Sequence, residues 1–183
     1  MMIEATTASL TLAGLTLVLY AFLDLIGINI VYLIKYVVSS EVRRRRCEVK
    51  EFIELVLPQR LNIIYNVLLG IRKPDNVPLP TVILNFREAE RPGGKYFLGV
   101  IVLDIPKMSV KDLIPVLDHE LIHYIQDLEG MTGSRQYLEG MAMYVELKLH
   151  HAIRGYRREL IYFLRYKDKE PLKYVYGADP DIL

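Results

Sequence analysis

Hydrophobic positions along the chain follow several distinct patterns. Residues 8–38 are apolar almost without interruption, and residues 48–70 carry apolar positions at helical spacing on both sides of a proline. Residues 81–86 and 96–103 are rich in β-branched and aromatic residues and are separated by a turn with the sequence Pro-Gly-Gly. Beyond them the pattern becomes helical again. The sequence therefore predicts an α+β fold in which a short antiparallel sheet packs on the helices that follow.

The first apolar stretch is long enough to cross a membrane once. A bilayer core requires about 20 apolar residues in a helix, and residues 8–38 contain one such span, interrupted by Asp24 and Asn29. Its length, the absence of a Lys or Arg before it and the lack of a small-residue cleavage site disfavour a cleaved signal peptide. The alternative is a buried helix of a soluble protein, although such helices are usually shorter. We therefore predict a transmembrane anchor in residues 1–40.

Charge and composition add a direction to this anchor. Four consecutive arginines, residues 43–46, follow the apolar stretch, whereas Glu4 is the only charged residue before it. The positive-inside rule then predicts a single-pass protein whose C-terminal part is cytoplasmic, and the arginines are also able to contact anionic lipid headgroups.

The chain has 23 Lys and Arg against 22 Asp and Glu, so its overall charge does not favour a nucleic-acid partner. Its single cysteine, Cys47, excludes an intramolecular disulfide and a cysteine-based zinc site.

The next helical stretch contains the pattern H-E-x-x-H, with His119, Glu120 and His123 as its fixed residues. Two histidines four positions apart lie on one face of a helix, so both imidazoles can reach one ion. Imidazole suits Zn²⁺, and a catalytic zinc keeps three protein ligands and an open position for water, whose proton a neighbouring glutamate can take. The pattern also arises by chance, but the flanking residues predict a buried helix, in which three polar groups require partners.

A third ligand is expected from the helix that follows. Glycines at positions 130 and 133 break the chain after the first helix, and Ser134 is a suitable N-cap for a second one. Glu139 lies early in that second helix and is able to point toward the ion. Ala142, three positions on, keeps the same face small, so that the two helices can approach closely.

These two segments resemble a known family. H-E-x-x-H followed by a glutamate in the context L-E-G-x-A-x-Y-x-E resembles the gluzincin zinc metallopeptidases, most closely their small, minimal members, over roughly residues 81–151. The resemblance implies that His119, His123 and Glu139 bind Zn²⁺ and that Glu120 is the general base and acid. It also implies a zincin-like catalytic domain, which we place in residues 81–168. Helical patterning and a proline-rich connector predict juxtamembrane helices and a linker in residues 41–80, and prolines and a glycine near the end predict an irregular tail in residues 169–183.

In such a domain the strand at residues 96–103 would form the edge of the cleft and pair with an extended peptide, although a hairpin that merely covers the core requires the same residues.

The oxyanion of a tetrahedral intermediate needs a further donor. The four candidates are Tyr137, Tyr144, His150 and His151, of which we choose Tyr144. The two tyrosines are equally compatible with a packing role, and the two histidines are equally compatible with a solvated helix end. Glu146 or Asp127 is expected to orient a zinc-binding imidazole, unless it is an ordinary surface carboxylate.

Three functions are open at this point. The first is a membrane-anchored, cytoplasmic zinc metalloendopeptidase that hydrolyses a peptide or protein substrate. The second is a catalytically silent zinc-binding membrane scaffold that holds a partner protein, and the third is a membrane protein without metal, in which H-E-x-x-H arose by chance. The tail is long enough to fold back over a cleft, so deletion of residues 170–183 is expected to raise activity if the intact chain is latent.

Overall fold

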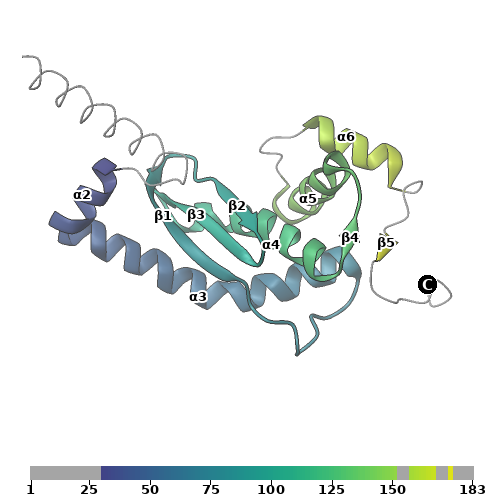
Figure 1. Ribbon diagram of the computed structural model, residues 1–183, viewed down its shortest axis with the longest axis horizontal. Helices are drawn as coiled ribbons and strands as arrows, with labels where there is room; N and C mark the ends of the chain where they lie inside the picture. Colours follow the sequence, from purple (N-terminus) through teal and green to yellow (C-terminus); the bar gives the residue numbers. More distant parts are fainter. Residues whose placement is uncertain (1–29, 152–156, 168–172, 175–183) are drawn as a thin grey trace, which may run out of the picture.

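The structure, a computed structural model, describes residues 30–151, 157–167 and 173–174. Most of the predicted membrane segment and nearly all of the tail therefore lie outside the described residues. The described part is an α+β fold, as predicted (Figure 1). Its elements in chain order are α2 (Ile30–Val38), α3 (Ser40–Leu69), β1 (Thr81–Ala89), β2 (Gly94–Phe97), β3 (Val100–Pro106), the 3₁₀ helix η1 (Val110–Leu113), α4 (Ile114–Leu128), β4 (Met131–Thr132), α5 (Arg135–His150), α6 (Arg157–Tyr166) and β5 (Lys173–Tyr174).

The three-stranded sheet is mixed, so the prediction of an antiparallel sheet was wrong. The strand order is β1-β3-β2, with β3 parallel to β1 and antiparallel to β2. The second predicted strand, residues 96–103, is in fact two strands, because Leu98 and Gly99 form a tight turn with φ angles of 45° and 81°. Such primed turns match the twist of a hairpin, but they rarely use leucine. As a result β2, and not the whole of residues 96–103, is the outer strand of the sheet.

The helical positions on both sides of Pro58 belong to one helix, α3. Ser39 caps its start by accepting a hydrogen bond from Val42 N, and Gly70 ends it with a left-handed φ of 70°. By length and composition α3 could cross a membrane, a criterion that core helices of soluble proteins also meet. In the described protein its apolar side belongs to the same core as the sheet and α4. That side buries Val49, Ile53, Leu57, Leu61, Ile64 and Tyr65.

The arginines at the start of α3 are mostly engaged with the protein. Arg43 donates to backbone carbonyls at the end of α2, and Arg45 to those of Pro106 and Met108. Arg46 donates to two carbonyls of β1 and lies over the ring of Phe86. These contacts fasten α3 to α2 and to the sheet. Of the four arginines expected to contact lipid headgroups, only Arg44 has no polar partner among the described residues.

The helix α4 lies between the outer strand β2 and the helix α5, so its two sides face different neighbours (Figure 1). Most of its apolar residues are buried, although Leu128 at its C-terminal end is 41% exposed. On the far side of α5, Gly140 lets α6 approach closely, because a Cβ there would lie 2.1 Å from the carbonyl oxygen of Glu159. At the C-terminal end of the described chain, β5 pairs with β4, in the connection between α4 and α5. This arrangement leaves a cleft between β2, α4 and α5.

Candidate metal centre

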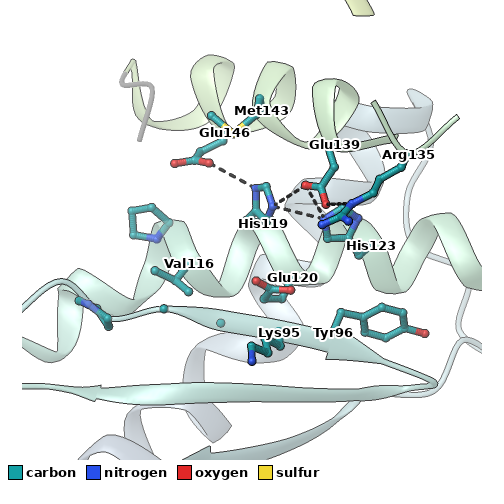
Figure 2. Close-up of a pocket in the computed structure, with 14 residues that line it drawn as sticks. Lys95, Tyr96, Val116, His119, Glu120, His123, Arg135, Glu139, Met143 and Glu146 are labelled. Carbon is teal, nitrogen blue, oxygen red and sulfur yellow. Dashed lines mark hydrogen bonds and ion pairs between the residues drawn. The ribbon is translucent and has the colours of Figure 1, made fainter. Parts of the chain in front are cut away.

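The cleft has a volume of about 640 Å³ and is bordered by β2 on one side and by α5 on the other, with α4 as its floor (Figure 2). From α4 it receives the three fixed residues of the H-E-x-x-H pattern, and from α5 it receives Glu139. Ser134 caps α5 as predicted, because its hydroxyl accepts a hydrogen bond of 3.2 Å from Tyr137 N. This cap fixes where α5 begins and therefore where Glu139 falls along it.

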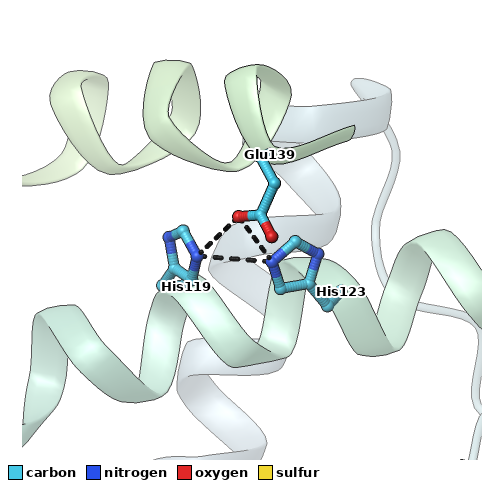
Figure 3. A group of neighbouring side chains, drawn as sticks. All are labelled: His119, His123 and Glu139. Atoms are coloured by element: carbon cyan, nitrogen blue, oxygen red, sulfur yellow. Dashed lines mark hydrogen bonds and ion pairs between the residues drawn. The ribbon is translucent and has the colours of Figure 1, made fainter. Parts of the chain in front are cut away.

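His119, His123 and Glu139 converge on one point between the two helices (Figure 3). Nε2 of His119 lies 3.5 Å from Oε2 of Glu139, and Nε2 of His123 lies 3.4 Å from the same oxygen. The two Nε2 atoms are 3.3 Å apart. Ligands about 2.0–2.1 Å from a tetrahedral zinc stand about 3.3–3.4 Å from one another, because a tetrahedron's edge is about 1.6 times its centre-to-corner distance. The three donor atoms therefore fit one face of a zinc tetrahedron and leave the fourth corner open.

The charges of this triangle favour a cation at its centre. Two imidazole nitrogens and a carboxylate oxygen all offer lone pairs to the same point. Burial lowers the pKa of His119, but the carboxylates of Glu139 and Glu146 outweigh burial and raise that pKa to about 9. Hydrogen bonds with His119 and His123 in turn hold the pKa of Glu139 well below its usual range. A proton on an imidazole or a divalent cation can supply the positive charge that the cluster requires.

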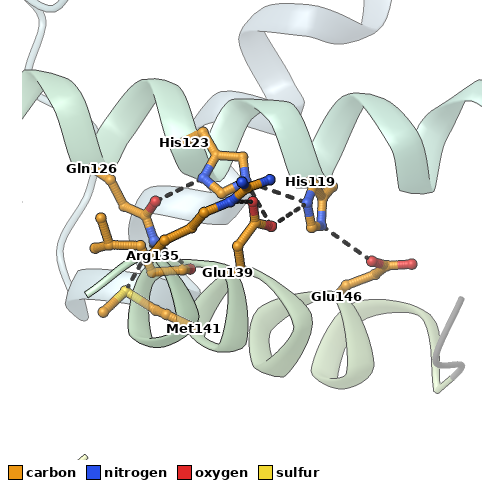
Figure 4. Close-up of polar contacts among 8 residues, drawn as sticks. His119, His123, Gln126, Arg135, Glu139, Met141 and Glu146 are labelled. Carbon is orange, nitrogen blue, oxygen red and sulfur yellow. Dashed lines mark hydrogen bonds and ion pairs between the residues drawn. The ribbon is translucent and has the colours of Figure 1, made fainter. Parts of the chain in front are cut away.

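Both imidazoles are held from behind, which leaves their Nε2 atoms directed at the common point (Figure 4). Nδ1 of His123 lies 2.8 Å from Oε1 of Gln126, whose Nε2 donates to the carbonyl oxygen of Leu138 at 3.0 Å. That donation fixes which end of the amide faces His123, so Nδ1 carries the proton and Nε2 is free to bind a metal. Nδ1 of His119 lies 3.5 Å from Oε2 of Glu146. Gln126 was not predicted, although it lies three positions after His123 on the same helix face.

Of the two carboxylates expected to orient an imidazole, only Glu146 lies beside one. Asp127 accepts a hydrogen bond from the hydroxyl of Tyr96 instead. The same hydroxyl accepts a hydrogen bond of 2.9 Å from Gly99 N. Asp127 therefore connects α4 to the β2–β3 turn and helps to hold the outer strand in place beside the metal centre.

The structure does not bring Tyr144 to the cleft. It lies five positions after Glu139, which corresponds to about 140° around a helix of 3.6 residues per turn. Its ring packs against Phe163 at 5.4 Å between centroids, and Nζ of Lys148 lies 4.6 Å from the ring centre. A hydrogen bond with Lys148 lowers the pKa of Tyr144. The choice of Tyr144 as the oxyanion donor therefore has no support from its position.

The other three candidates for that role also lie away from the cleft. Tyr137 is buried and packs against Phe163 at 5.1 Å between ring centroids. Nε2 of His150 lies 2.7 Å from Oδ2 of the buried Asp118, so the expectation of a solvated helix end was wrong for this residue. His151 is exposed and ends α5 with a left-handed φ of 53°. None of the four lines the cleft.

Glu120 lies on the side of α4 that faces β2, where it is 6% exposed (Figure 2). Burial raises its pKa, and the nearby imidazoles only partly oppose this increase. Its carboxylate fits because the facing residue of β2 is Gly94. A Cβ at that position would lie 2.7 Å from Cγ and 2.8 Å from Oε1 of Glu120. The strand therefore approaches Glu120 more closely than a residue with a side chain would allow.

The outer strand directs backbone groups that do not pair with β3 away from the sheet. Asp104 N donates to the carbonyl of Gly93, and the register pairs Gly94 with Leu103 and Tyr96 with Ile101. Hydrogen-bonded pairs alternate along an antiparallel ladder, so the N–H and C=O groups of Gly94 and Tyr96 point away from β3. The backbone amide of Tyr96 already contacts the Glu120 carboxylate. A short open edge is thus available beside the metal centre.

No protein-family model, curated protein or solved structure matches the chain. The chemistry of the site must therefore be inferred from its own residues.

Proposed function

We propose that this chain is a membrane-anchored zinc metallopeptidase of the gluzincin type. The observation that carries the proposal is the fit of the His119, His123 and Glu139 donor atoms to one face of a zinc tetrahedron. A buried glutamate of raised pKa adjoins that triangle, at an open strand edge. Ligands, base and edge are the parts that peptide hydrolysis with an activated water requires.

Each residue has a defined role in this proposal. His119, His123 and Glu139 would hold the zinc, which when bound polarises a carbonyl group and lowers the pKa of water. Glu120 would accept the proton of the attacking water on its carboxylate and deliver it to the leaving amine. Its raised pKa suits both steps, because a group that accepts and then donates a proton works best when its pKa lies near the working pH. The edge of β2 would align an extended substrate by backbone pairing.

The membrane part of the proposal has support from α2. This helix continues the apolar stretch of residues 8–38 and exposes a row of aliphatic side chains at spacings of three or four residues. These are Val31, Ile34, Val37 and Val38. Removal of residues 1–40 is expected to move the protein from the membrane fraction to the soluble fraction of a lysate. The arginines at positions 43–46 favour a cytoplasmic catalytic part, which protease protection of inverted and right-side-out vesicles would test.

One observation favours the second candidate, a zinc-binding scaffold without catalysis. Apart from the ligands and Glu120, the described residues that line the cleft include no buried hydrogen-bond donor side chain aimed at the metal centre. Oxyanion stabilisation by such donors is often worth a hundredfold or more in rate. A scaffold would need the metal and the strand edge but no such donor.

Metal content and cleavage in four proteins separate these functions. Purified in detergent, the full-length chain is expected to bind about one zinc per molecule, and Glu139→Ala to lose most of it. Glu120→Gln is expected to retain the zinc while cleavage of a peptide library falls by about a hundredfold or more. Glu90→Ala, which removes an exposed carboxylate outside the cleft, is the matched control. Zinc without cleavage in the wild type would favour the scaffold, and absence of zinc would leave a membrane protein without metal.

A further inference from the structure

Arg135 is a cation at the mouth of the cleft that the fold does not use. It is the first residue of α5, its side chain is 88% exposed, and it lines the cleft. Its one polar contact among the described residues is a long one, 3.8 Å from its Nε to Oε1 of Glu139. Oε1 is the oxygen of Glu139 that does not contact the imidazoles. The two terminal nitrogens of the guanidinium, which carry four of its five N–H donors, are therefore available to a ligand.

Unlike Arg44 and Arg72, which are exposed and lie outside the cleft, three other arginines in the described chain have structural roles. Arg60 binds the buried Asp118 with two nitrogens, and Arg45 and Arg46 donate to backbone carbonyls. Each of these side chains connects two elements of the fold. Arg135 connects only neighbouring turns of its own helix, and weakly. Structural need therefore does not explain an arginine at this position.

The two ends of the cleft differ in chemistry (Figure 2). Val116 and Met143 lie toward one end, on the side of Glu146, and present apolar surface. Arg135 lies at the opposite end, toward His123, on the same side of the cleft as Tyr96. An extended ligand that passes the metal centre would thus meet an apolar wall on one side and a guanidinium on the other.

The exposure of Arg135 decides between two roles in catalysis. A donor that stabilises an oxyanion must be preorganised in a site from which water is excluded, and an 88% exposed guanidinium is neither fixed nor dry. A planar fork of donors at the rim instead matches a carboxylate, which it can bind through two hydrogen bonds. We propose that Arg135 binds a carboxylate of the peptide substrate and so selects acidic peptides. This inference rests on the proposed peptidase function.

Matched peptides test the selection. The probes are fluorescent peptides that differ in one residue near the scissile bond, Glu, Gln or Lys, each made as a C-terminal acid and as a C-terminal amide. We would measure kcat/KM for each peptide with the zinc-loaded full-length protein. We would also measure the affinity of each peptide for the zinc-loaded Glu120→Gln protein. The Glu peptide is expected to be preferred over the Gln peptide roughly three- to tenfold. Arg135→Gln should abolish the preference, and Arg135→Glu should transfer it to the Lys peptide.

Arg72→Gln is the matched control, because it removes an equally charged, exposed side chain outside the cleft and should leave the preference unchanged. A preference that depends on the C-terminal acid and on Arg135 would identify the terminal carboxylate as the recognised group. Equal affinity for Glu and Gln peptides would overturn the proposal, and so would an equal loss of kcat for both in Arg135→Gln, which would indicate oxyanion stabilisation. Acid-dependent binding through Arg135 without any cleavage would support carboxylate recognition and reject the peptidase.

Discussion

Two clusters of buried or partly buried ionisable groups adjoin the same helix, α4, and they are neutralised in different ways. On the side that faces α5, His119, His123 and Glu139 direct three lone pairs at one point. On the side that faces α3, the fully buried Asp118 is bound by Arg60, with Nε 2.8 Å from Oδ1, and by His150 at 2.7 Å. The second cluster contains a permanent cation, Arg60, whereas the first becomes positive only when an imidazole takes up a proton or an ion binds.

This difference separates a structural cluster from a candidate functional one. A buried carboxylate that is already paired with an arginine gains nothing from an external ion, and its partners connect three helices. A cluster of convergent acceptors with perturbed pKa values is stable only when a proton or a metal joins it. Burial and charge alone would have marked both clusters as sites, so the balance of donors and acceptors is the more informative property.

The largest effect is expected in the Asp118 cluster. Asp118→Asn leaves the mostly buried guanidinium of Arg60 without its counter-charge and should lower the free energy of unfolding by about 3–5 kcal/mol. Urea unfolding followed by circular dichroism measures this loss. The double variant Asp118→Asn, Arg60→Leu should recover part of the stability, because the uncompensated charge is gone. If the single variant were as stable as the wild type, the pair would contribute nothing to the fold.

The metal centre should respond to zinc where the Asp118 cluster does not. Free zinc at a hundred times its dissociation constant is expected to raise the free energy of unfolding of the wild type by about 2.7 kcal/mol. The same addition should leave Glu139→Ala unchanged but should still stabilise Asp118→Asn. Thermal unfolding with and without zinc measures these increments. Equal stabilisation of wild type and Glu139→Ala would show that zinc binds elsewhere.

A smaller effect is expected from the residue that holds His123. Gln126→Leu removes the acceptor for Nδ1 of His123 and should weaken zinc binding about 10- to 100-fold without abolishing it. Competition with a chromogenic chelator measures the change. Gln136→Leu, a substitution of the same kind at an exposed position of α5 outside the cleft, is the control. Unchanged affinity in Gln126→Leu would mean that the contact with Leu138 alone, and not the imidazole, explains the position of this amide.

The parts of this site that the sequence predicted are those set by local geometry. The i, i+4 spacing of His119 and His123 places both imidazoles on one face of α4, and Ser134 marks the start of α5. These two signals fix the positions of the side chains along their helices, and the packing of α5 against α4 then brings Glu139 to the histidines. The overall α+β class follows in the same way from the periodicity of apolar positions.

The parts that the sequence missed depend on contacts between distant segments or on one unusual backbone angle. The parallel pairing of β1 with β3 follows from the position of the chain reversal, and a leucine at a φ of 45° gives little sign of a turn. Asp118, Arg60 and His150 come from three helices, so no spacing pattern links them. For Tyr144 the 100° rotation per helical residue already indicates a direction away from Glu139, so its place on α5 does not support a role as oxyanion donor.

The smallest effect sharpens the comparison between histidines. His150→Gln should remove one hydrogen bond from Asp118 but leave both contacts with Arg60, so the expected loss of stability is about 1 kcal/mol. Zinc content should remain that of the wild type. His123→Gln, the same substitution at the metal centre, should instead abolish most zinc binding while changing the stability of the zinc-free protein by a similar amount. The two variants differ in one respect only: one histidine contacts a carboxylate that already has a cation, and the other contributes a lone pair to a point that lacks one. Loss of zinc from both variants would mean that the two faces of α4 form a single coupled site.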